Sequence, residues 1–253
     1  MRTKIVFSTL IFCILSFSSC KKDDAVKLEL LTTSLSIKAG SDAQIQLSPN
    51  IDGCVFESEN PLIASVSSNG KVSGKIIGDV VINITNSSQK FSAKCNVTVT
   101  PQYQMYREPY MNFGASASQI KSYETRKIFS ETSDGNGIGY EGENSRIAMV
   151  LYFLENSKYK TSYAMIPYSS SNADLLVDFL SERYTVIVDK SDIFFFSIDR
   201  KLAGSIDPYS YSGTYYYRVM YFENPLASRS NSIEIDIIRE KVESVKALFK
   251  TNN

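Results

Sequence analysis

The sequence contains no histidine and no tryptophan among its 253 residues. Histidine is the commonest general base and a common metal ligand. Its absence therefore excludes any Ser-His-Asp or Cys-His catalytic arrangement. The absence of tryptophan weakens the case for sugar stacking without excluding it, because 16 tyrosines and 14 phenylalanines also offer ring faces.

The sequence also lacks an excess of charge of either sign, because 27 Lys and Arg balance 27 Asp and Glu. A protein that neutralises nucleic-acid phosphates needs a basic surplus, so we expect no nucleic-acid partner. The carboxylates are scattered, and no glycine-rich phosphate loop is present. Asp134-x-Asn136 is like the start of a calcium loop, but Ser145 stands where the closing Glu is needed. We expect no catalytic, cofactor or metal site and no enzymatic activity.

An apolar run lies at the amino end, where residues 5–17 follow Arg2 and Lys4 and are interrupted only by Ser and Thr. As a helix, this run would be roughly 20 Å long, too short for a hydrocarbon core of about 30 Å. A basic start, a short apolar run and then small residues are typical of a secretory signal. The pattern predicts a signal peptide over residues 1–19.

Ser18-Ser19-Cys20 resembles the lipobox of bacterial lipoproteins, in the looser form of the Bacteroidetes, with Phe17 in place of the usual aliphatic residue. The resemblance implies that Cys20 carries acyl chains such as palmitate and anchors the protein in the outer membrane. Residues 21–24, KKDD, resemble an export tag for the cell surface, and a solvated tether over residues 20–26 is the plainer interpretation. A secreted protein without a lipid is the alternative to lipidation.

Residues 27–100 contain short alternating strands separated by turn signals, which predicts an all-β sandwich. Asn69-Gly70 indicates a two-residue hairpin turn, because both residues tolerate positive φ. Cys54 lies two residues before Phe56, and Cys95 is in phase with two later valines, so we expect both cysteines to face the core.

The stretch FESENPLIASVSSNGKVSGKIIGDVVINIT, with the closing AKCNVTV, resembles the bacterial immunoglobulin-like domain of group two (Big_2). The resemblance rests on Phe56, Asn60-Pro61, Gly70-x-Val72-x-Gly74 and Val97-x-Val99. It implies an immunoglobulin-like sandwich that serves as a spacer or adhesion module without catalysis. In an exported protein Cys54 and Cys95 have two alternatives, a disulfide or two buried free thiols.

Residues 101–253 alternate helical and strand patterns, beginning with a linker at Pro101 and a capping box at Ser116 and Gln119. We expect an α+β domain with helices on an antiparallel sheet and a possible internal α-β-β-β duplication. The expected elements after the capped helix are strands at 137–141, 146–155 and 160–168, a helix within 169–184, and strands at 184–190, 192–201 and 214–223. A terminal helix should follow, with Ile238, Val242, Val245 and Phe249 on one face. Its first residues, 233–237, alternate and could form a strand instead.

The stretch PYSYSGTYYYRVMYF, residues 208–222, is the most tyrosine-rich in the chain. Both faces of strand 214–223 are largely apolar, which predicts a central strand under a helix. Tyr209 and Tyr211 then fall in the preceding loop, where they are candidates for binding a glycan or a protein ligand.

The motif FGASASQIK also resembles, over one short stretch, envelope domains built from repeated α-plus-antiparallel-β units, such as β-lactamase inhibitor proteins and small lipoproteins that help assemble outer-membrane proteins. That resemblance implies a protein-binding sheet. Our main hypothesis is a surface-exposed, lipid-anchored binding or adhesion module. The alternative is a periplasm-facing structural or assembly factor.

Overall fold

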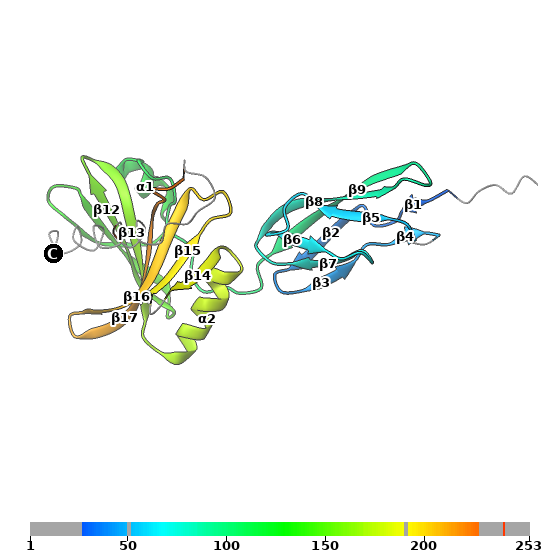
Figure 1. The fold of residues 1–253 in the computed structure, drawn as a ribbon. Coiled ribbons are helices and arrows are strands. Elements are labelled where there is room, and N and C mark those ends of the chain that lie inside the picture. The colour runs from blue at the N-terminus through cyan, green and yellow to red at the C-terminus, as the bar shows by residue number, and fades with distance from the viewer. Residues whose placement is uncertain (1–26, 50–51, 190–191, 228–239, 241–253) are drawn as a thin grey trace, which may run out of the picture.

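The computed structural model describes residues 27–49, 52–189, 192–227 and residue 240. The expected signal peptide, the lipidation site Cys20 and the tether lie outside the described residues, and so does the expected terminal helix apart from residue 240. Two bodies lie end to end, and β1 is at the end of the first body that is farthest from the second (Figure 1).

The first body is an immunoglobulin-like β region made of short strands. A four-stranded sheet of order β2-β9-β8-β5 faces a three-stranded sheet of order β3-β7-β6, and β1 pairs with β4. β2 runs parallel to β9, whereas the other strand pairs are antiparallel. The strands are β1 (Glu29–Leu30), β2 (Ser34–Lys38), β3 (Asp42–Gln44), β4 (Leu47–Ser48), β5 (Val55–Ser58), β6 (Ala64–Val66), β7 (Lys71–Gly74), β8 (Gly78–Asn86) and β9 (Phe91–Thr100).

The predicted hairpin at Asn69-Gly70 exists, but its turn is longer than the two residues expected. It runs from Ser67 to Gly70 between β6 and β7, and of its residues only Gly70 has positive φ, at 76°. The Ser67 hydroxyl accepts the Lys71 N–H at 3.1 Å, which stabilises this wider turn. A Cβ on Gly70 would lie 3.1 Å from the Phe56 ring, so glycine is favoured by space as well as by φ.

The second body is a mostly-β domain with one eight-stranded antiparallel sheet and two short helices. The sheet order is β10-β11-β12-β13-β17-β16-β15-β14, so two four-stranded meanders meet at the antiparallel pair β13 and β17. The elements are α1 (Ala117–Tyr123), β10 (Ile128–Glu131), β11 (Gly137–Asn144), β12 (Ile147–Glu155), β13 (Lys158–Pro167), α2 (Ser170–Ser181), β14 (Thr185–Asp189), β15 (Asp192–Phe196), β16 (Leu202–Tyr211) and β17 (Thr214–Glu223).

The order of elements, one helix and four strands, occurs twice, whereas the sequence had suggested three strands in each half. In the second half the missed strand is β16, which places Tyr209 and Tyr211 on a strand and not in a loop. Pro208 makes this strand hard to recognise in the sequence, because proline is disfavoured inside a sheet. It is tolerated here because β15 pairs with β16 only as far as Ile206, so β16 is an edge strand beyond that point.

The capping box was predicted correctly: the Ser116 hydroxyl accepts the Gln119 N–H, and the Gln119 side chain accepts the Ser116 N–H. The helix that it begins is short, because α1 ends at Tyr123 and β10 begins at Ile128.

β17 is a central strand, as its sequence predicted, and it is buried on both faces from Arg218 to Phe222. Val219 and Tyr221 lie on the face against which α1 and α2 pack, which we call the helical face. Met220 and Phe222 lie on the other side, which we call the opposite face. A strand buried on both sides needs apolar residues at nearly every position, which explains why its sequence does not alternate.

The carboxyl end of α2 connects the two bodies. The Glu182 carboxylate accepts the N–H groups of Gln102 and Tyr103 at 2.7 and 3.1 Å, and its carbonyl accepts the Ile77 N–H at 2.7 Å. Arg183 donates to the same carboxylate at 2.5 Å and lies 3.7 Å from the centre of the Phe179 ring. One residue of the second domain therefore holds both the linker and the β7–β8 turn of the first domain.

Candidate functional site

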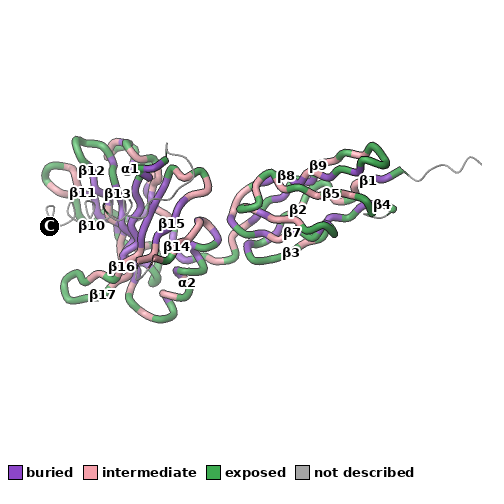
Figure 2. The backbone as a smooth tube through the Cα atoms, viewed as in Figure 1, coloured by how far each residue is buried: buried purple, intermediate pink, exposed green. Residues whose placement is uncertain are grey.

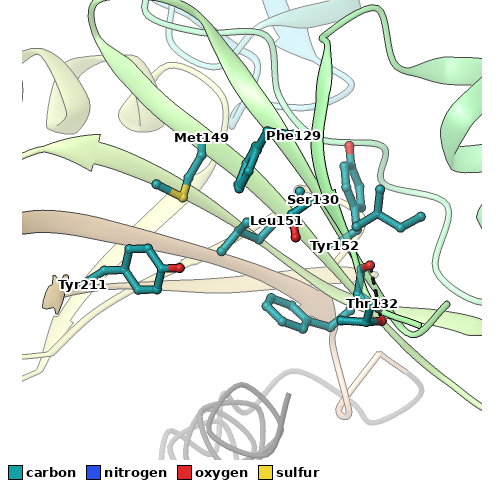
Figure 3. A pocket seen from close by; sticks show the side chains of 11 residues that line it. Phe129, Ser130, Thr132, Met149, Leu151, Tyr152 and Tyr211 are labelled. Atoms are coloured by element: carbon teal, nitrogen blue, oxygen red, sulfur yellow. Dashed lines mark hydrogen bonds between the residues drawn. The ribbon is translucent and has the colours of Figure 1, made fainter. Parts of the chain in front are cut away.

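A small groove lies on the opposite face of the sheet, at the β10–β12 end (Figure 3). Its cavity is about 80 Å³, well below the roughly 300–1,000 Å³ typical of small-molecule sites. Phe129, Met149 and Leu151 form apolar walls, and Tyr211 closes one end. Because Tyr211 comes from β16, three strands away from β12, the β16–β17 hairpin must curl over this face. The groove is sized for one apolar side chain.

The floor of the groove is made by two glycines of β11. A Cβ on Gly139 would lie 2.7 Å from the Phe129 ring, and one on Gly137 would lie 2.8 Å from the Thr132 methyl group. These glycines thus leave room for their neighbours to close over the strand.

Tyr209, the other tyrosine singled out by the sequence, does not line the groove. The Arg218 guanidinium lies 4.3 Å from the centre of the Tyr209 ring. Arg218 also makes a bidentate contact with Asp207, at 2.9 and 2.6 Å. One ring face of Tyr209 is therefore occupied within the protein. Of the two tyrosines singled out by the sequence, Tyr211 lines the groove and Tyr209 packs against the Arg218–Asp207 ion pair.

A different group of tyrosines is exposed on the helical face, at the end of the same hairpin. We call Tyr168, Tyr215 and Tyr217 the tyrosine platform. Tyr168 and Tyr215 are 57% and 65% exposed. The Tyr168 ring stacks on Tyr217 at 4.5 Å and lies edge-on to Tyr215 at 6.5 Å. Sequence reasoning missed Tyr168, because its neighbours lie more than 40 residues along the chain.

The interior of the second domain contains a network of tyrosine hydroxyls and ionised groups. Tyr106 and Tyr221 share a hydrogen bond of 2.5 Å, and Tyr184 donates to Glu108 at 2.6 Å. Burial, followed by the charge of Glu108, raises the pKa of Tyr184 well above its ordinary value. Burial also raises the pKa of Glu108, although Tyr184 and Arg183 act in the other direction.

A buried ion pair forms the second half of this network. Arg126 donates to both oxygens of Glu124 at 2.8 Å and to Glu143 at 2.6 Å. The side chains of Arg126 and Glu124 are 1% and 0% exposed. Tyr152 donates to Glu124 and accepts the Tyr110 N–H at 2.7 Å. Because Arg126 is paired with both Glu124 and Glu143 inside the protein, this network organises the core of the second domain.

Cys54 and Cys95 are free thiols in the structure, in which Cys95 is buried and Cys54 is half-buried. Cys95 is buried opposite Ile82, and Ile82 in turn is opposite Ser58, four residues beyond Cys54. At about 3.4 Å per residue and 4.8 Å per strand, the two cysteines lie on the order of 15 Å apart. A disulfide needs Cα atoms within about 7 Å, so this register does not permit one.

The calcium-like motif is a turn between β10 and β11. The Asp134 carboxylate accepts the Thr132 hydroxyl at 2.6 Å and the Asn136 N–H at 3.0 Å. These hydrogen bonds lower the pKa of Asp134. In the part of the chain that the structure describes, no group of three or more Cys, Asp or Glu is placed to hold a metal ion. Neither described helix is long and apolar enough to cross a membrane.

Residues 40–97 match the family described as bacterial Ig-like domain (group 2). This confirms the resemblance inferred from Phe56 to Val99 for the first domain. No curated protein matches the chain.

Three solved structures are similar to parts of the chain, each with a TM-score of 0.24. An intimin mutant of EHEC O157:H7 is 18% identical over 46% of this chain and 82% of its own. Domains 5–6 of the S-layer protein SbsC are 12% identical over 79% and 85%, and human protocadherin-24 EC1-2 is 11% identical over 77% and 93%. A TM-score this low does not indicate a shared overall fold.

Proposed function

We propose that this protein is a non-catalytic binding module of the outer membrane, anchored by lipid at Cys20 and exposed at the cell surface. The immunoglobulin-like domain is its stalk, and the second domain binds the ligand. The observation that carries this proposal is the end-to-end arrangement. The described chain begins at one end, and the exposed tip of the β16–β17 hairpin belongs to the body at the other end (Figures 1 and 2).

The junction at Glu182 supports the role of a stalk. Its carboxylate and carbonyl together accept three backbone N–H groups, from Ile77, Gln102 and Tyr103, on the linker and the first domain. Hydrogen bonds to a charged acceptor are stronger than neutral ones. A stalk that is held firmly to its head keeps the binding surface away from the membrane.

Proteinase treatment of intact cells tests the location. An epitope at the carboxyl end should be lost without lysis, and a Cys20→Ala variant should leave the membrane fraction. Protection of the epitope until the outer membrane is broken would contradict surface exposure.

The groove favours a second candidate, a periplasm-facing assembly factor that binds an envelope protein. Its volume of about 80 Å³ and its walls of Phe129 and Leu151 fit an apolar side chain supplied by a protein partner. Cross-linking in whole cells followed by co-purification would separate the candidates, because this one requires a protein partner from the same envelope.

A further inference from the structure

We infer that the tyrosine platform, at the end of the β16–β17 hairpin, is a binding site for a neutral oligosaccharide or polysaccharide. The inference rests on the proposed function and gives its ligand a chemical class. It assigns binding to the helical face of the hairpin, whereas Tyr209 and Tyr211, the candidates from the sequence, lie on the opposite face.

The rings of the platform are held in place by backbone pairing. The Tyr168 N–H donates to the Tyr215 carbonyl at 3.2 Å, which continues the β13–β17 ladder by one residue beyond Pro167. Tyr215 lies directly opposite Ser210 and Tyr217 opposite Pro208. Three adjacent strands thus present Tyr168, Tyr215 and Ser210 in one row, with Tyr217 in the next.

Exposed tyrosine rings on a rigid backbone suit sugar recognition. The C–H face of a pyranose packs against an aromatic face, and the phenol hydroxyl at the ring edge exchanges hydrogen bonds with sugar hydroxyls. Tyrosine also presents this area at low cost in conformational entropy, since it has only two χ angles. Tyr168 and Tyr215 together supply two exposed rings that are set at 61° to each other.

Hydroxyl groups border the rings. Ser169 caps α2, and Ser170 and Ser171 follow beside Tyr168. Small hydroxyl residues beside tyrosines give adaptable hydrogen bonding around a rigid aromatic contact. The surface therefore matches a ligand that is rich in both C–H faces and hydroxyl groups.

The charge around the platform favours a neutral ligand. Asp174 lies close enough to the Tyr217 hydroxyl to help raise its pKa, after the effects of partial burial and of Tyr168. Residues 166–181 and 208–217 contain no Lys or Arg, and their charged members are Asp174 and Asp178. A carboxylate accepts hydrogen bonds from sugar hydroxyls but repels uronic acids, sulfated sugars and phosphates.

The test uses the purified full chain in detergent and a panel of neutral polysaccharides (glucan, mannan, xylan and galactan). Polygalacturonate and alginate serve as acidic counterparts. Migration through native gels that contain each polymer gives a relative affinity. At least one neutral polymer should retard the protein, and neither acidic polymer should do so.

Four variants locate the site. Tyr168→Ala and Tyr215→Ala should each weaken binding about tenfold, because each removes one stacking ring. Tyr215→Phe keeps the ring and should lose less. Tyr211→Ala is the matched control, since it is exposed on the same hairpin but on the opposite face, and it should bind as the unaltered chain does. Circular dichroism establishes that each variant is folded.

Equal retardation by acidic and neutral polymers, or a loss of binding in Tyr211→Ala alone, would overturn the inference. If no polysaccharide retards the protein but a protein ligand is captured from outside the cell, the inference fails and the proposed surface-binding function stands. If the epitope is protected in intact cells, the proposed function fails, whatever the gels show.

Discussion

The two domains have cores of different chemistry. All 16 tyrosines lie at or after residue 103, and residues 27–100 contain none. The core of the first domain is built from Ile, Val, Leu, Ala and one Cys, with Phe56 and Phe91 at its margin. In the second domain, five of the largest fully buried side chains are tyrosines: Tyr140, Tyr152, Tyr159, Tyr163 and Tyr221.

The aliphatic core of the first domain and the tyrosine-rich core of the second specify their folds in different ways. An aliphatic core needs only the right pattern and volume, so it suits a spacer whose sequence is free to vary. A core that contains hydroxyls and ion pairs must satisfy each of them, which penalises every arrangement but one. The second domain, which we propose binds the ligand, is the one built in the more demanding way.

The largest expected effect comes from breaking the buried ion pair of the second domain. Arg126→Ala leaves Glu124 as an unpaired charge with a side chain that is 0% exposed. We expect it to lower the free energy of unfolding by about 3–5 kcal/mol. Urea unfolding followed by tyrosine fluorescence measures this directly, because every tyrosine lies outside the first domain.

The neighbouring residue provides the control for this change. The Lys127 side chain is 76% exposed in its ion pair with Glu141, so Lys127→Ala should cost about 1 kcal/mol or less. Equal losses for the two variants would show that the buried network does not stabilise this domain.

The next effect compares two buried tyrosines in the same core. Tyr152→Phe removes a hydroxyl that donates to Glu124 and accepts the Tyr110 N–H, and we expect a loss of about 1–3 kcal/mol. The Tyr140 hydroxyl is buried without a hydrogen-bond partner among the described residues. Tyr140→Phe should therefore leave the stability unchanged or raise it. If Tyr140→Phe lowered the free energy of unfolding in urea more than Tyr152→Phe did, the hydrogen bonds assigned to Tyr152 would be wrong.

These residues also show what the sequence could predict. The capping box at Ser116 and the burial of β17 on both faces depend on residues a few positions apart, so their patterns are visible in the chain. The first domain was recognisable for a similar reason, because its turn residues stand at fixed spacings around Gly70 and Gly74.

Features that depend on long-range pairing were not predictable. The ion pair of Arg126 with Glu143 depends on how β11 and the residues after α1 pack, and Tyr168 meets Tyr215 only through the register of β13 against β17. The distance between Cys54 and Cys95 likewise depends on register across three strands. Alternation indicates which face a residue takes but not which residue of the neighbouring strand lies beside it.

A smaller effect concerns pH. Burial raises the pKa of Glu108, despite its contacts with Tyr184 and Arg183. A carboxyl whose pKa is higher in the folded state binds more protons there. Stability therefore falls as pH rises from the unfolded value, about 4.3, through the raised folded value.

Glu108→Gln should remove that loss, because the amide keeps an oxygen for the Tyr184 hydroxyl and carries no charge. At pH 7 we expect the variant to be as stable as the unaltered chain or more stable. Thermal unfolding of both proteins between pH 4 and pH 7 measures the difference. A variant that is less stable than the unaltered chain at pH 7 would show that the charge of Glu108 stabilises the fold.

The smallest expected effect concerns the two cysteines of the first domain, and it tests whether this domain is stable without a covalent cross-link. Because Cys54 and Cys95 are free thiols set apart by the register, a reductant should leave the unfolding of this domain unchanged. Circular dichroism near 215 nm, read beside tyrosine fluorescence, separates its transition from that of the second domain. A disulfide closing this loop would instead contribute about 4 kcal/mol. A large loss on reduction would require β5 or β9 to pair with β8 in a different register, and the aliphatic domain would then depend on a covalent constraint.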